Sequence, residues 1–229
     1  MDLQLDRHQR DLAMALRAAL AGADPDDVGS RLKDLDLYAL ECPVAQDGLG
    51  LGLGMGVIVA EELGRYAARD DYRHRAAERD RATVPAGRVK TRERIRQAAY
   101  LLGLATGAHR LAVQRAAQRH QFGTALAQRQ AIAFPLAAQY AHQEALCLLV
   151  HRAAWLDDRN EPAGPAAARA LAYAAEQALE ATAWAVHVHG AFALTRHAPV
   201  HRHRELAAVE AVRLGSPSML WRESKEASS

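Results

Sequence analysis

Apolar side chains recur every three or four residues over most of this chain, which is the spacing of an amphipathic α-helix. The clearest run extends from residue 91 to residue 120, and Thr91 is placed to cap its start. Its inward positions are Ile95, Ala98, Ala99, Leu102, Ala105, Leu111 and Ala112. The pattern therefore predicts one long helix over 91–120.

The same spacing predicts five more helices, over about 6–21, 57–63, 130–155, 166–189 and 199–214. Asp24 followed by Pro25 indicates a further helix start. Pro135 lies in the first turns of its helix, where proline is tolerated, and Gly190 ends the next helix. Four successive helices with short connections favour an antiparallel bundle.

Residues 65–92 interrupt this pattern, because they are charged and almost free of large aliphatic side chains. We expect a solvated helix followed by a loop at "TVPAG", or partial disorder, and we expect Glu61 and Glu62 to be solvated too. The alternative is a segment that interacts with a partner chain. The predicted fold is all-α, with an N-terminal helical unit (1–68), a charged connector (69–90), a four-helix bundle (91–222) and a polar tail (223–229).

Composition agrees with a helical protein, since alanine and leucine dominate and aromatic residues make up only 5% of the 229 residues. A net charge of +2 provides no strong field for nucleic acid or an anionic membrane. No signal peptide or membrane-spanning run is present in the sequence, so we expect a soluble cytoplasmic protein. Cys42 and Cys147 are too few for a disulfide framework or a cysteine-rich zinc site. The glycine-rich stretch at 48–56 does not fit a dinucleotide fingerprint.

Histidines cluster near the end of the chain, but their spacing argues against a metal site. His197 and His201 could share a helix face, yet no acidic ligand recurs with them, and the i, i+2 pairs diverge on a helix. The other members of the cluster are His187, His189 and His203. We therefore predict no metal site.

Three segments, in order, resemble the acyl-CoA dehydrogenase family. They are "LDLYALECPVAQDGLGLGLGMGVIVAEELGR" (35–65), "TRERIRQAAYLLGLATGAHRLAVQRAAQRHQFGTALAQRQAIAFPLA" (91–137) and "WAVHVHGAFALTRHAPVHRHREL" (184–206). Full-length members of that family have an N-terminal helical domain, a middle β-barrel domain and a C-terminal four-helix bundle. Here residues 65 and 91 are joined by a short charged segment, so we expect a truncated member without the barrel.

The resemblance implies an FAD cofactor held between subunits, with the "RHQFG" turn contacting the flavin of the neighbouring chain. Carried over, the candidates are Arg119, Phe122, Gly123 and Gln130. An arginine can pair with the pyrophosphate, an aromatic ring can pack on the adenine and glycine permits a tight turn. The alternative is a surface arginine, a core phenylalanine at the end of the bundle and an ordinary turn glycine.

A second cofactor contact is implied at the "HGG" break of the family, which contributes His187, Gly190 and Thr195 here. His187 replaces the usual glutamine, and Ala191 and Ala193 replace glycines. Each alanine restricts positive φ and close backbone approach, so we expect weaker FAD binding by the isolated chain.

The family removes the α-proton of an acyl thioester with a carboxylate while hydride moves to the flavin. One family position for this base corresponds to Leu214, which cannot serve, and the other corresponds to Glu93. The alternative for Glu93 is a first-turn acid that complements the helix dipole.

Three functions remain open from the sequence. The first is FAD-dependent α,β-oxidation of an acyl thioester, bound to CoA or a carrier protein, with a partner chain completing the site. The second is a flavin-free enzyme of the same fold acting on a tethered acyl or polyketide-like substrate. The third is a non-catalytic subunit of a heteromeric dehydrogenase. Each implies a homodimer or a heteromer with a homologue.

Overall fold

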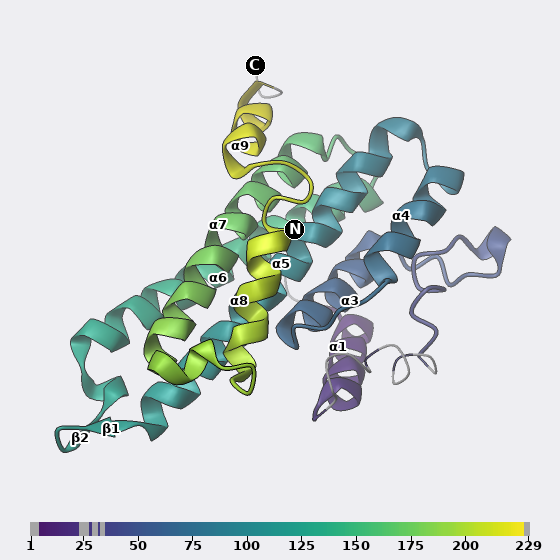
Figure 1. Cartoon of the computed structure of the whole chain (residues 1–229). Helices are drawn as coiled ribbons and strands as arrows, with labels where there is room; N and C mark the ends of the chain where they lie inside the picture. Colours follow the sequence, from purple (N-terminus) through teal and green to yellow (C-terminus); the bar gives the residue numbers. More distant parts are fainter. Residues whose placement is uncertain (1–4, 23–27, 29–31, 33–34, 227–229) are drawn as a thin grey trace.

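The computed structural model describes residues 5–22, 28, 32 and 35–226 (Figure 1). The first half contains α1 (Arg7–Leu20), η2 (Val44–Gln46), α3 (Leu53–Arg65), α4 (Tyr72–Thr83), α5 (Ala86–Gln118), β1 (His120–Gln121), β2 (Thr124–Ala125) and η3 (Leu126–Gln128). The second half contains α6 (Gln130–Asp158), α7 (Gly164–His189), η4 (Gly190–Leu194), α8 (Pro199–Glu210) and α9 (Pro217–Glu226). The all-α prediction is confirmed: across the described residues the only sheet is the two-residue pairing of β1 with β2, and there is no barrel.

Three long helices, α5, α6 and α7, lie side by side, and α8 packs across α5 and α7 (Figure 1). Small residues line the α5–α7 contact, including buried Ala98, Ala105, Ala168 and Ala175. Alanine has good helix propensity and lets two backbones approach closely, which explains the alanine-rich composition. On the other side of α5 lie α3 and α4, and α1 packs on α3. None of the described helices is long and apolar enough to cross a membrane.

Several helix limits differ from the prediction. Thr91 is not a cap, because α5 begins five residues earlier at Ala86, directly after Pro85. The predicted 199–214 helix ends at Glu210, and α9, which was not predicted, follows from Pro217. The start predicted at Asp24 and Pro25 lies outside the described residues.

The charged stretch 65–92 contains the predicted helix, α4, and a break at Val84 and Pro85 within "TVPAG", but the expectation that this helix is solvated was wrong for one of its sides. One side of α4 is buried, including Tyr72, Arg73 and Asp80. Glu62 is also buried, where it accepts from Arg17 at 2.7 Å. Charges can be buried here because they are paired.

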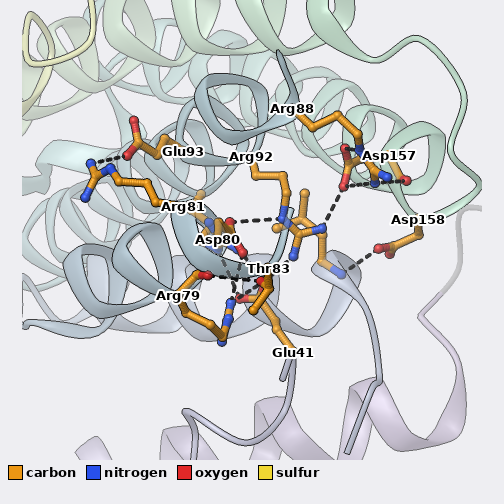
Figure 2. A network of polar contacts seen from close by, with 12 residues as sticks. Glu41, Arg79, Asp80, Arg81, Thr83, Arg88, Arg92, Glu93, Asp157 and Asp158 are labelled. Carbon is orange, nitrogen blue, oxygen red and sulfur yellow. Dashed lines mark hydrogen bonds and ion pairs between the residues drawn. The ribbon is translucent and has the colours of Figure 1, made fainter. Parts of the chain in front are cut away.

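A network of ion pairs joins the loop at Glu41 to α4, α5 and α6 (Figure 2). Arg92 contacts three carboxylates, at 2.9 Å from Glu41, 3.0 Å from Asp80 and 2.7 Å from Asp157. Arg96 contacts Glu41 and Asp80 as well. Hydropathy cannot predict this core, since its members score as surface residues.

Asp158, the residue after Asp157 on α6, caps the start of α3 with its carboxylate. It accepts from the backbone N–H groups of Leu53 at 2.6 Å and Gly54 at 2.9 Å. The N-terminal helices are therefore fixed to the bundle by polar contacts in addition to apolar packing.

Candidate functional site

The "RHQFG" motif forms a tight hairpin beyond the end of α5 (Figure 1). His120 pairs with Ala125, and Gln121 pairs with Thr124, so Phe122 and Gly123 are the two turn residues. Their φ angles are +51° and +80°, as in the turns that connect two-residue hairpins. The Phe122 side chain is 92% exposed, which excludes the alternative of a core phenylalanine.

Two arginines surround this ring. Arg119 ends α5 and has no side-chain partner among the described residues, whereas Arg129 lies 5.4 Å from the centre of the Phe122 ring. Arg129 also donates to the Gln121 carbonyl at 2.8 Å, which braces the hairpin. Its buried Nε has no partner within the part of the chain that the structure describes, and the same holds for Arg115 Nε. The sequence reasoning missed Arg129, whose only signal was its position next to Gln130.

Gln130 is the first residue of α6 and is exposed. No side chain caps this helix start, and the N–H groups of Gln130 and Ala131 have no acceptor among the described residues. These N–H groups and the side chains of Arg119 and Arg129 give this end of the bundle a positive electrostatic character, which suits an anionic group.

The second predicted segment lies at the end of α7. Gly190 ends that helix at φ +67°, which requires glycine, and a Cβ built there would meet no atom within 4 Å. His187 is exposed and packs edge-on against Trp184, with ring centres 5.2 Å apart, beside a cavity of about 290 Å³. The Thr195 hydroxyl donates to the Phe192 carbonyl at 2.8 Å, so it already has a partner.

A small apolar cluster connects these two segments. Ala112 and Ala116 of α5 pack in it with Leu136 of α6 and Val188 of α7, and Leu126 lies at its edge. The hairpin, the start of α6 and the end of α7 therefore share one end of the bundle. The structure brings seven of the eight candidate residues to this end.

The eighth candidate, Glu93, lies elsewhere. It pairs with Arg81 of α4 at 2.8 Å, and its side chain is 19% exposed (Figure 2). Since α5 begins at Ala86, Glu93 is not in the first turn, and the helix-dipole alternative is wrong. Glu93 and Arg119 are near opposite ends of α5, roughly 40 Å apart at about 1.5 Å per residue.

Glu93 borders a cavity of about 130 Å³. Leu214, at the other family position for the base, lines the same cavity. Three arginines also line it: Arg73, Arg81 and Arg213. Glu93 and Leu214, the two family positions for the base, therefore lie beside the same cavity, among arginine side chains.

The C-terminal histidines do not form a cluster. His201 pairs with Glu205 at 3.2 Å, whereas His203 is buried between the carbonyls of Pro199 and Arg65, at 3.1 Å from each. Burial lowers the pKa of His203, which favours the neutral ring.

Comparison with known proteins identifies the family. A profile described as "Acyl-CoA dehydrogenase, C-terminal domain" matches residues 88–223, which is more than half of the chain. The chain therefore belongs to the acyl-CoA dehydrogenase family.

Two similar proteins are longer than the part that this chain matches. Caffeyl-CoA reductase-Etf complex subunit CarC of Acetobacterium woodii is 38% identical over 109 residues, which are 48% of this chain and 29% of that protein. Butyryl-CoA dehydrogenase of Megasphaera elsdenii is 32% identical with a TM-score of 0.59, over 61% of this chain and 36% of that one. The chain thus spans about a third of the length of these relatives.

One chain of the ChsE4-ChsE5 complex from Mycobacterium tuberculosis shares the fold more widely. The TM-score is 0.88 at 17% identity, over 99% of this chain and 98% of that chain. At this identity the likeness concerns the fold alone.

Proposed function

We propose that this chain is a subunit of an FAD-dependent acyl-CoA dehydrogenase that carries out α,β-oxidation of an acyl thioester. Its hairpin borders a flavin site that a second chain completes. The observation that carries the proposal is Phe122, an aromatic ring that is almost fully exposed on a left-handed backbone. Such an arrangement is unfavourable in a lone chain and favourable when a ligand or partner covers the ring.

The residues at this end fit the cofactor by their chemistry. Arg119 and the N–H groups that open α6 suit a pyrophosphate, Phe122 suits an adenine, and Gly123 and Gly190 leave the backbone accessible. The partnerless Nε atoms of Arg115 and Arg129 are further donors. When bound, FAD would accept the hydride from the β-carbon of the thioester.

Glu93 is the proposed base for the α-proton. Its distance along α5 from the hairpin means that the two cannot serve one site within one chain. A dimer resolves this, because the hairpin of one chain can border the site that holds Glu93 of another. The similar protein CarC is a subunit of a caffeyl-CoA reductase-Etf complex, which supports an assembly of more than one chain.

The test compares the chain purified alone with the chain co-expressed with a full-length homologue. We expect the visible flavin absorption band in the complex and little or none in the lone chain. Arg119→Ala should reduce the flavin content of the complex, whereas Arg7→Ala, which changes an exposed arginine of α1, should not. If the complex is colourless and does not take up added FAD, the proposal fails.

A second experiment separates catalysis from binding. Glu93→Gln should leave the flavin content unchanged and slow oxidation of an acyl-CoA by roughly 10²–10⁴-fold. Glu78→Gln, an exposed acid on α4, is the matched control and should retain full activity. Unchanged oxidation in Glu93→Gln would show that Glu93 is not the base.

A non-catalytic subunit is the second candidate. Its support is local: Glu93 is already paired with Arg81, and the Thr195 hydroxyl is already bonded within its own turn. In that case the complex would bind FAD, yet Glu93→Gln would change neither flavin content nor turnover.

A further inference from the structure

Cys147 and His151 lie one turn apart on α6, beside the α3 residue Glu61. Their potential ligand atoms, one from each side chain, all lie within 4.8 Å of one another. All three residues are half-buried, so the cluster is shielded and still reachable from solvent. It is far along α6 from the flavin hairpin, since Gln130 and Cys147 are roughly 25 Å apart at about 1.5 Å per residue.

The three donors are the types that bind zinc. A thiolate, an imidazole and a carboxylate each form Zn²⁺ bonds of about 2.0–2.3 Å, and a cysteine ligand disfavours Mg²⁺ and Ca²⁺. Donors of one ion therefore lie within about 4 Å of each other, and small side-chain rotations bring these three into that range. The i, i+4 spacing places both α6 ligands on one face of the helix.

The side chains of Cys147 and His151 lack other partners. Neither has a hydrogen bond to any residue in the described ranges, whereas Glu61 is paired with Arg65. Burial raises the pKa of the Cys147 thiol to about 12, and Glu61 and Glu144 add to the effect. Burial also lowers the pKa of His151. The Cys147 sulfur and the His151 ring nitrogens therefore have no competing partner within the described residues.

Glu61 has the support that a ligating carboxylate needs. Arg65, one turn along α3, donates to its Oε1, which leaves Oε2 free. Arg65 also contacts Glu62 at 3.2 Å, so its charge is shared between two carboxylates. Hydrogen bonds of this kind orient metal ligands in known sites.

We propose that Glu61, Cys147 and His151 bind one Zn²⁺ ion, which clips α3 of the N-terminal unit to α6 of the bundle. Coordination ionises the thiol, and its proton passes to solvent. Three protein ligands leave the fourth tetrahedral position for water. The site is independent of the flavin and of the proposed oxidation.

The experiment uses the full chain without an affinity tag, after chelator treatment. Co²⁺ titration should produce a sulfur-to-cobalt charge-transfer band and the visible bands of a tetrahedral ion, and Zn²⁺ should displace the cobalt. Zn²⁺ should also raise the thermal unfolding midpoint.

Variants assign the ligands. Cys147→Ser should abolish the charge-transfer band, and His151→Ala or Glu61→Gln should weaken Zn²⁺ affinity by more than roughly tenfold. Cys42→Ser and His201→Ala, which change a cysteine and a histidine outside the cluster, should bind like wild type. Circular dichroism checks that each variant is folded.

Two results would overturn the proposal. One is a wild-type chain that shows no charge-transfer band with Co²⁺, an outcome that does not depend on any variant folding. The other is a folded Cys147→Ser chain that binds Zn²⁺ as tightly as wild type.

Discussion

Phe122 combines two unfavourable features, a left-handed backbone and an exposed ring. The backbone conformation costs a non-glycine residue roughly 1–2 kcal/mol, and the next residue is a glycine that adopts it freely. A glycine at position 122 would therefore make the same turn with less strain. The phenylalanine is consistent with selection for a contact outside this chain.

Replacing Phe122 with glycine separates stability from binding. We expect the free energy of unfolding to change by less than about 1 kcal/mol, because relief of strain offsets the greater unfolded-state entropy of glycine. The flavin content of the complex should nevertheless fall. Urea denaturation and visible absorption measure the two effects, and Val209→Ala, which trims another exposed apolar side chain, should alter neither. A flavin content equal to wild type would contradict the role of the ring.

Glu41 is fully buried among arginines, and its charge should control acid stability. Burial alone would raise its pKa, but Arg96, Arg92 and Arg79 outweigh burial and hold the pKa below its ordinary value of about 4.5. A carboxyl whose folded-state pKa is lowered stabilises the fold fully above its unfolded pKa. That contribution is lost as the pH falls through the folded-state value.

Glu41→Gln should therefore cost about 3–5 kcal/mol at neutral pH, because it leaves buried arginines without their counter-charge. The difference from wild type should narrow as the pH falls below about 4.5. Unfolding free energies measured at intervals from about pH 3 to about pH 7 would detect this narrowing of the difference. The exposed Glu161→Gln should stay within about 0.5 kcal/mol of wild type throughout. A difference that does not change with pH would exclude Glu41 as the titrating group.

At the scale of elements, α3 and α5 pack against each other at glycine residues. A Cβ added to Gly103 of α5 would lie 2.0 Å from the Glu61 carbonyl oxygen and 2.7 Å from the Arg65 nitrogen. Gly64 and Gly107 are equally crowded against backbone atoms. These glycines let the N-terminal unit dock on the bundle at backbone distance.

Gly103→Ala should destabilise the fold by at least about 1–3 kcal/mol, since two backbones must separate to admit the methyl group. Gly87→Ala is the matched control on the same helix, because its Cβ would meet nothing within 4 Å. Helix propensity predicts a gain of up to about 1 kcal/mol for Gly87→Ala. Thermal and urea unfolding of both variants test this, and equal stability of the two would contradict the packing argument.

Helical periodicity predicted most of these elements, since apolar residues recur along α5, α6 and α7, Gly190 marks the end of α7 and Pro199 marks the start of α8. Periodicity gave the wrong result where ion pairs, and not apolar packing, determine the structure. The early start of α5 and the buried face of α4 depend on ion pairs between residues far apart in sequence, such as Glu41 and Arg92. Residue propensity contains no information on such pairs.

The candidate site was predictable to a similar extent. A contiguous sequence motif identified the hairpin. The contact of Arg129 with the hairpin and the proximity of Glu61 to Cys147 and His151 depend on how segments pack in space. The sequence alone does not predict that packing. Counting cysteines missed the latter group, because two of its three donors are not cysteines.

At the scale of the molecule, α6 has an apolar stripe that no described part of this chain covers. Phe134, Leu148 and Trp155 are 64%, 47% and 38% exposed, and with exposed Ala141 they repeat every seven residues. A seven-residue repeat places these side chains along one side of the helix, as in helices that pair with another helix. The stripe begins near the hairpin of β1 and β2, so one partner could cover both.

We therefore expect association, with itself or with a homologue, through this stripe. Leu148→Glu puts a charge at the centre of the stripe and should weaken association by roughly 30-fold or more, the equivalent of about 2 kcal/mol. Size-exclusion chromatography with light scattering, over a range of concentrations, measures the effect. Val113→Glu makes the same kind of change at an exposed position of α5 and should leave the mass unchanged. If Leu148→Glu assembles like wild type, another surface makes the contact. If the wild-type chain stays monomeric both alone and with a homologue, the two-chain flavin site fails with it, because Glu93 and the hairpin then have no means of meeting.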